Sequence, residues 1–138
     1  MPDFSNNRIA FTARRSTSFS SSSNSASFPF EETVTNLPGT SFDVETGIFT
    51  CNLPGTYVFM FSVLKKPNAD FLCVNLLKNG TNLVSALSSG SDKYEQVSGS
   101  AVHVLQRGDR VYLAVHGTAY SESNRRYTSF SGFLLHAE

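Results

Sequence analysis

Three histidines and many serines are the residues of this chain that could carry catalysis, so their spacing is informative. His103 alternates with valines, His116 precedes a glycine, and His136 lies near the end of the sequence. The sequence has no H-x-x-x-H, H-E-x-x-H or G-x-S-x-G pattern, and no glycine-rich loop leads from a strand into a helix. The serines concentrate in residues 16–27, without a base in recognisable register. We therefore expect a protein that is not an enzyme and uses no organic cofactor.

Two arginine pairs and one sequon are the candidate binding and modification sites. Arg14 and Arg15 form one pair, and Arg125 and Arg126 form the other. They could bind anionic ligands such as lipopolysaccharide or acidic glycans, although isolated arginine pairs are more often simply solvated. Asn79 begins an Asn-Gly-Thr sequon, which predicts a glycan on an exposed turn of a secreted protein.

Length and charge limit the classes of protein to which the chain can belong. Its 138 residues suit one domain spanning residues 1–138. Eleven basic and eleven acidic side chains cancel, so nothing favours nucleic acid as a partner. No apolar run is long enough for a membrane span. The first residues lack the pattern of a signal peptide, and we expect an excised domain whose leader and flanking parts lie elsewhere.

The most informative element is the strand predicted for residues 56–64, which follows a Pro-Gly turn. Tyr57, Phe59 and Phe61 recur at every second position, so they share one face of the strand. The intervening Val58 and Met60 are also apolar. A strand that is apolar on both faces needs cover on both, either inside a sandwich or at a subunit interface.

The rest of the chain also consists of short strands and turns, with no convincing helical period. Asn79 and Gly80 predict a tight type I′ hairpin, while the serine-rich residues 16–27 predict a long, mobile surface loop. The pattern indicates an all-β fold, an antiparallel sandwich or jelly roll of about ten strands. The other strands are predicted at residues 9–13, 42–44, 48–51, 71–78, 83–87, 97–106, 111–115 and 127–136.

The order of these motifs resembles the globular head domain of the complement C1q family, a member of the C1q/TNF-like jelly rolls. The resemblance covers nearly the whole chain, from residues 9–13 to residues 133–135. It leaves the subgroup open between complement-type, cerebellin-like and caprin-2-like branches. The motifs that carry it are, in order, Phe42, Phe49, the series Gly55-x-Tyr57-x-Phe59-x-Phe61, Ser98-Gly99-Ser100-Ala101-Val102, Gly108-Asp109 and Ser129-Phe130-Ser131-Gly132-Phe133.

The resemblance also bears on the two cysteines, Cys51 and Cys73. Both lie in apolar, strand-like runs, where a buried free thiol is the simpler interpretation. In complement chains the cysteine that matches Cys73 pairs with one near the position of Ser88, and that partner is missing here. The resemblance thus implies reduced thiols, with a disulfide between Cys51 and Cys73 as the alternative.

Members of the family assemble as compact trimers, and the doubly apolar strand agrees with this. We expect a homotrimer in which part of a set of five aromatic residues lines the threefold axis. The alternative is that each member belongs to the core of its own chain. The set consists of Tyr57, Phe59, Phe61, Tyr112 and Phe130.

Family heads often bind calcium through a loop that aligns with residues 88–96 of this chain. Gln96 matches a ligand position, whereas the acidic ligand aligns near Ser89 and is lost. Asp92 and Glu95 could replace it, since calcium takes oxygen ligands and three subunits would multiply the carboxylates. The alternative is a solvated acidic loop.

The resemblance implies a secreted, trimeric recognition module of innate defence that binds microbial or other surface ligands through its loops, with avidity. Its partners would be further copies of the chain and protein, carbohydrate or lipid surface ligands. One alternative is a trimeric signalling or adhesion ligand that engages a cell-surface receptor, as cerebellin-like and TNF-like relatives do. Another is a protein-interaction domain of a larger intracellular protein, as in the caprin-2-like branch.

Overall fold

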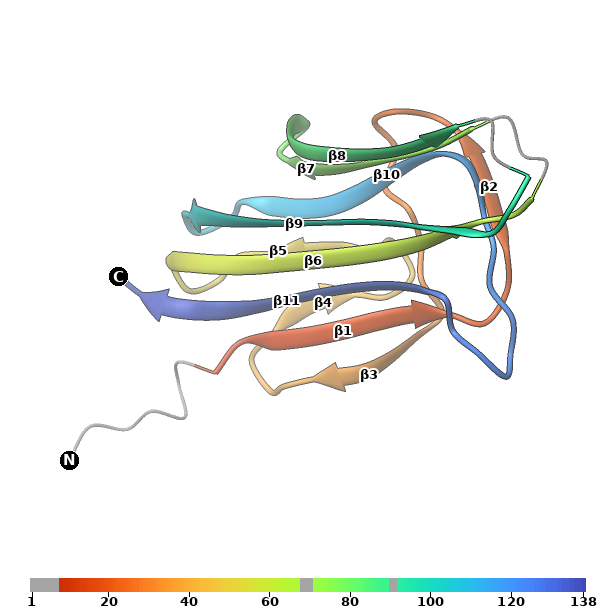
Figure 1. Cartoon of the computed structure of the whole chain (residues 1–138). Coiled ribbons are helices and arrows are strands. Elements are labelled where there is room, and N and C mark those ends of the chain that lie inside the picture. The colour runs from red at the N-terminus through yellow and green to blue at the C-terminus, as the bar shows by residue number, and fades with distance from the viewer. Residues whose placement is uncertain (1–7, 68–70, 90–91) are drawn as a thin grey trace.

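Two antiparallel sheets packed face to face make up the computed structural model, which describes residues 8–67, 71–89 and 92–138 (Figure 1). Within those ranges no helix is long and apolar enough to cross a membrane. The strands are β1 (Ala10–Arg15), β2 (Phe19–Ser22), β3 (Glu32–Asn36), β4 (Ser41–Asp43), β5 (Ile48–Thr50), β6 (Gly55–Lys65), β7 (Phe71–Lys78), β8 (Thr81–Ser89), β9 (Glu95–Leu105), β10 (Arg110–Ala119) and β11 (Thr128–Ala137).

The strand order confirms the predicted all-β jelly roll. One sheet has the order β3-β1-β11-β6-β9, and the other has the order β4-β5-β10-β7-β8, with β2 also paired to β10. The predicted hairpin at Asn79 and Gly80 joins β7 to β8, and both residues have positive φ angles, 52° and 84°. Positive φ at both central positions is what a type I′ turn requires.

The serine-rich segment differs from the prediction of a surface loop. Residues 19–22 form β2, whose backbone pairs with the end of β10, for example Ser20 with Thr118. Strand pairing uses backbone groups and therefore does not need an apolar sequence. Phe19 anchors the segment, because its ring packs edge-on against Phe28 at a centroid distance of 5.3 Å.

The core lies between the inner faces of the two sheets and is built mainly from aromatic rings. Tyr57, Phe59 and Phe61 of β6 are at most 3% exposed, as their alternation predicts. Phe59 lies 6.2 Å from Phe130 of β11, and Phe130 lies 5.1 Å from Phe11 of β1, between ring centroids. Phe49 of β5, in the opposite sheet, lies 5.5 Å from Phe11 and 5.8 Å from Phe59, so its ring joins the two sheets of the sandwich.

The outer face of the five-stranded sheet is apolar at its centre. Val58 pairs with Val102 of β9 on one side and with Phe133 of β11 on the other. Met60, Val102 and Val104 are 42%, 62% and 47% exposed. Solvent-facing positions of an antiparallel sheet are normally polar, so this surface needs an explanation. We call Val58, Met60, Val102, Val104 and Phe133 the outer apolar face.

Candidate functional site

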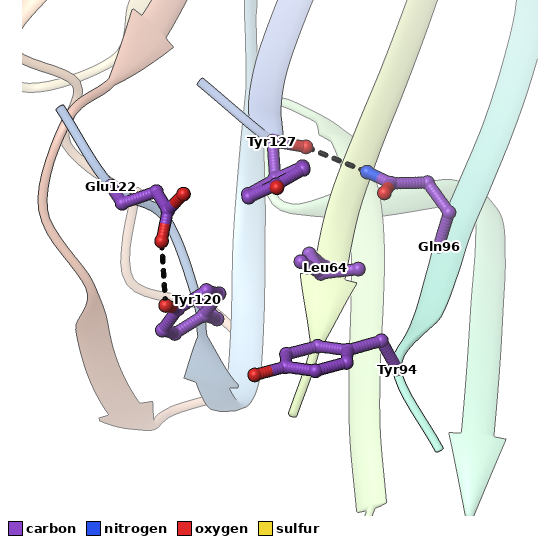
Figure 2. Close-up of a pocket in the computed structure, with 6 residues that line it drawn as sticks. All are labelled: Leu64, Tyr94, Gln96, Tyr120, Glu122 and Tyr127. Carbon is purple, nitrogen blue, oxygen red and sulfur yellow. Dashed lines mark hydrogen bonds between the residues drawn. The ribbon is translucent and has the colours of Figure 1, made fainter. Parts of the chain in front are cut away.

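A pocket of about 330 Å³ lies at the end of the sandwich opposite the C-terminus, where β6, β9 and β10 meet the loop from β10 to β11. In Figure 2 the side chains surround Leu64, which is only 6% exposed and forms the floor. We call this the tyrosine pocket. Its lining residues are Leu64, Tyr94, Gln96, Tyr120, Glu122 and Tyr127.

Strand pairing places these residues together. Leu64 at the end of β6 lies opposite Gln96 of β9 and also forms a bridge with Tyr120, whose backbone N–H donates to the Leu64 carbonyl at 2.9 Å. The Gln96 side chain donates from Nε2 to the Tyr127 carbonyl at 2.6 Å (Figure 2). The ends of the loop from residue 120 to residue 127 are thereby fixed to β6 and β9.

The three tyrosine rings lie near one another on the walls of the pocket. The centroids of Tyr94 and Tyr120 are 5.8 Å apart, and those of Tyr120 and Tyr127 are 6.2 Å apart. Lys66 places its Nζ 5.6 Å from the centroid of the Tyr120 ring. That distance is typical of a cation–π contact, so the electron-rich face of this ring already attracts an ammonium group.

Glu122 gives the pocket its negative charge. The Tyr120 hydroxyl donates to Glu122 Oε2 at 2.9 Å (Figure 2). This hydrogen bond to the carboxylate raises the pKa of Tyr120, because it favours the protonated phenol. The pocket therefore combines aromatic faces with one carboxylate, a combination that suits cations.

No sequence motif marks this pocket, because its residues come together only through strand pairing and the loop that follows β10. One feature of the sequence could nevertheless have pointed to the pocket. Tyr120 and Tyr127 bracket one polar loop, and that loop begins and ends next to paired strands. Tyr94, just before β9, has no comparable local signal.

Two of the four predicted anion-binding arginines converge on one carboxylate. Arg14 and Arg126 each place Nε 2.9 Å from Oε1 of Glu32. Two guanidinium groups share a single negative charge there, so the cluster keeps a net positive charge. Arg125, the next residue along the loop, is exposed.

Arg15 is a correction, because the structure places it inside the molecule. Its side chain donates to the Thr17 carbonyl at 3.0 Å and to the Pro29 carbonyl at 2.9 Å. The guanidinium also lies 5.0 Å from the centroid of the Phe19 ring. Burial lowers the pKa of Arg15, and Glu31 partly offsets this effect. Arg15 is 7% exposed and secures the segment that leads into β2, so it is not available to an external ligand.

The predicted calcium ligands lie at the pocket end but do not form a cluster within one chain. Asp92, Glu95 and Gln96 are all exposed. Glu95 accepts a hydrogen bond from Ser88, and Gln96 is bound to the Tyr127 carbonyl. In the described part of the chain, no three histidine, cysteine or acidic residues are grouped to hold a metal. Calcium binding by these residues stays a prediction.

Asn79, the predicted glycosylation site, is exposed on its hairpin but also acts as a clamp. Its Nδ2 donates to Asp109 Oδ1 at 2.9 Å, and its Oδ1 accepts from the Arg110 backbone at 2.8 Å. The amide thus joins the β7–β8 turn to the β9–β10 turn. Glycan attachment at Asn79 stays a prediction.

Four of the five aromatic residues expected near a threefold axis are buried within their own chain. Tyr57, Phe59, Phe61 and Phe130 are at most 3% exposed and have no surface left for another subunit. They form the core of their own chain, which was the alternative. Tyr112 is half-buried and lies on the opposite face of β10 from the core residues of that strand, so it too is outside the outer apolar face.

Cys51 and Cys73 are both free thiols. Cys51 is buried and donates to the Leu53 carbonyl at 3.3 Å, and the Tyr57 hydroxyl donates to the same carbonyl at 2.6 Å. Burial raises the pKa of both the Cys51 thiol and the Tyr57 phenol. Cys51 is therefore an unreactive core residue.

Comparison with known sequences identifies a relationship over most of the chain. Residues 10–135 match the family model described as C1q domain. Caprin-2 of Danio rerio is 39% identical over 132 residues, and complement C1q tumor necrosis factor-related protein 3 of Mus musculus is 36% identical over 129. The matches cover 95% and 93% of this chain but only 14% and 51% of those proteins.

Solved structures show the same fold. The globular domain of zebrafish complement 1qA protein has a TM-score of 0.73 and 26% identity, over 94% of this chain and 99% of that one. The Eiger TNF of S. frugiperda has a TM-score of 0.77 with 14% identity, over 96% and 95% of the two chains. At that identity the second comparison speaks for the fold alone.

Proposed function

The chain belongs to the C1q domain family, and we propose that it is a trimeric recognition domain that acts outside the cell. Three identical domains would present three copies of the pocket end to one repetitive surface. Weak contacts at single sites then add up through avidity. The similarity to a complement protein supports the extracellular assignment.

The main support for a trimer is the outer apolar face. Val102 and Val104 on β9 and Met60 on β6 expose apolar surface at the centre of a sheet. On each side of the apolar centre the paired side chains are hydroxyl groups, such as Ser62 with Ser98 and Thr12 with Ser131, each pair 2.7 Å apart. An apolar centre with a polar rim is typical of a protein interface. Two further copies of the chain are the proposed cover.

The proposed ligands are anionic groups of microbial or other surfaces, such as lipopolysaccharide or acidic glycans. Arg14, Arg125 and Arg126 would bind them, and the net positive charge around Glu32 supports this. Arg15 has no part in the proposal, because it is buried.

Calcium is proposed to bind only in the trimer. Asp92, Glu95 and Gln96 would each contribute an oxygen ligand, and three subunits together would supply more oxygen ligands than one chain brings together. An affinity of about 10⁻⁴–10⁻³ M is expected for an extracellular site of this kind. Calcium should then raise the melting temperature of the trimer and chelator should lower it. An unchanged melting temperature would contradict the proposal.

A binding panel tests the recognition function. Immobilised lipopolysaccharide and heparin should retain the wild type, and the double variant Arg125→Gln/Arg126→Gln should elute at lower salt. A monomeric variant with a charge on the outer apolar face should lose most of the retention, because avidity is gone. Equal retention of monomer and wild type, or none on either surface, would contradict the proposal.

The identity to caprin-2 favours a second candidate. Only 14% of that protein matches this domain, so a similar domain there is part of a much longer chain. The domain would then bind protein partners on behalf of its flanking regions. A wild type that ignores both surfaces but captures one defined protein partner would favour this function.

A further inference from the structure

The tyrosine pocket has the composition of a site for an organic cation. Tyr94, Tyr120 and Tyr127 line it with aromatic rings, and Glu122 adds a carboxylate. Aromatic rings attract cations through their negative faces, and quaternary ammonium groups are typical ligands of such cages. Leu64 on the floor supplies the apolar surface on which methyl groups pack.

Lys66 provides independent support. Its ammonium group already lies 5.6 Å from the Tyr120 ring centroid, so this ring is accessible to a cation from the solvent side. Lys66 is exposed, and its long side chain can swing away from the ring. An external ammonium group with methyl substituents would compete with the Lys66 ammonium group for the Tyr120 ring. The competition predicts that removal of the Lys66 charge strengthens ligand binding.

We propose that the tyrosine pocket binds the alkylammonium group of a small ligand, with trimethylammonium compounds such as choline as the ligand class. The volume of about 330 Å³ is at the small end of the usual ~300–1,000 Å³ for ligand pockets, which suits one headgroup. The inference goes beyond the proposed function. All six lining residues belong to one chain, so the pocket can be titrated in the monomeric Val102→Glu variant as well as in the wild type, and a failure of trimer formation does not affect the first of these titrations.

Titration with choline, followed by NMR, tests the proposal. The neutral isostere 3,3-dimethylbutan-1-ol has the same shape without the charge and is the matched control ligand. Choline should shift the signals of Gln96 and the three tyrosines, and its methyl protons should move upfield because of the aromatic rings. The isostere should bind far more weakly, because it lacks the charge that the rings and Glu122 attract.

Variants of Tyr120, Glu122 and Lys66 separate charge from shape. Tyr120→Leu should weaken choline binding by about three- to fivefold, the share of one cation–π contact. Tyr120→Phe keeps the ring and is the matched control, with binding close to that of the wild type. Glu122→Gln should weaken binding by about two- to threefold, as for a partly exposed charge pair. Lys66→Ala should strengthen it.

Several results would overturn the proposal. They are no binding of choline, equal binding of choline and its isostere, or binding that Tyr120→Leu and Glu122→Gln leave unchanged. The Tyr120 backbone makes the contacts to β6, so these side-chain variants should keep the fold, and the remaining amide spectrum checks this.

The trimethylammonium group could come from a free metabolite or from a lipid headgroup. Co-sedimentation with phosphatidylcholine vesicles distinguishes the two sources. Sedimentation that free choline abolishes assigns the lipid headgroup, whereas choline binding without sedimentation assigns a free cation. Vesicle binding that choline does not compete for, and that Tyr120→Leu does not weaken, would count against the pocket.

Discussion

The two faces of strand β6 have similar compositions and opposite surroundings. Its inner face carries Tyr57, Phe59 and Phe61, which the chain itself buries almost completely. Its outer face carries Val58 and Met60, and Met60 remains 42% exposed. In most antiparallel sheets, apolar residues that face the core alternate with polar residues that face solvent. The central part of β6 is apolar on both faces, so it does not follow this pattern.

The difference shows that one chain completes only one of the two faces. The inner face contacts rings from other strands at centroid distances such as 5.4 Å between Phe49 and Tyr57. The outer face has apolar neighbours on β9 and β11, but among residues 8–67, 71–89 and 92–138 no further strand layer covers it. The inner face should therefore determine the stability of the fold, and the outer face should determine assembly.

The largest effect on folding is expected from Phe59→Ala. Removal of this buried ring should cost about 3–5 kcal/mol of unfolding free energy, because the surrounding side chains fill only part of the cavity that it leaves. Val102→Ala on the outer face is the control and should cost far less per chain. Urea denaturation at matched concentrations measures both. Equal losses would mean that the two faces do not differ as described.

Arg15→Gln should have the next largest effect, about 1–3 kcal/mol, because the Thr17 and Pro29 carbonyls lose their donor inside the protein. Arg126→Gln, in the solvent-accessible, half-buried cluster around Glu32, should change stability less, because the Arg14 side chain still pairs with that carboxylate. Thermal melts of the two variants give the comparison. Similar melting temperatures would contradict the structural role of Arg15.

Gly132→Ala should destabilise the inner face by overpacking. A Cβ atom at Gly132 would lie 2.7 Å from ring carbons of Phe11 and Phe59. The expected cost is about 1–3 kcal/mol. Ser131→Ala, one residue away on the outer face, is the matched control, and denaturation curves should show little change for it. Adding Phe59→Leu to Gly132→Ala should recover part of the lost unfolding free energy, because the smaller side chain relieves the clash with the new Cβ atom. If the double variant recovers none of it, the clash with Phe59 is not the cause of the loss.

The smallest effect concerns acid stability at the opposite end from the pocket. Hydrogen bonds from the Gln106 backbone and from Asn79 lower the pKa of Asp109. A lowered folded-state pKa stabilises the fold above the unfolded value of about 3.9, and this contribution is lost as pH falls through the folded value. Asp109→Asn should therefore lower the melting temperature at pH 7 more than at pH 3. Equal shifts at both pH values would contradict this.

Much of the fold could be predicted from the sequence, because period-two alternation and turn dipeptides are local signals. The β6 alternation and the Asn79–Gly80 turn are of this kind. Strand β2 was missed because its serines give no alternation, and its pairing with β10 depends on backbone groups.

The sites were less predictable, because side-chain partners come from distant parts of the chain. Arg14 and Arg126 both contact Glu32, although 112 positions separate them in the sequence. Arg15 and Arg14 are neighbours in sequence but point to opposite faces of β1, so Arg15 is buried and Arg14 is only half-buried. No local pattern distinguishes them without the register of the sheet.

Light scattering can show whether the outer apolar face holds three chains together. At micromolar concentration the wild type should have a mass of about 45 kDa, three times the 15.1 kDa of one chain. Val102→Glu, which places a charge at the centre of that face, should have the mass of one chain and keep the wild-type circular dichroism spectrum. A wild type that is monomeric, or a Val102→Glu variant that remains trimeric, would contradict the account.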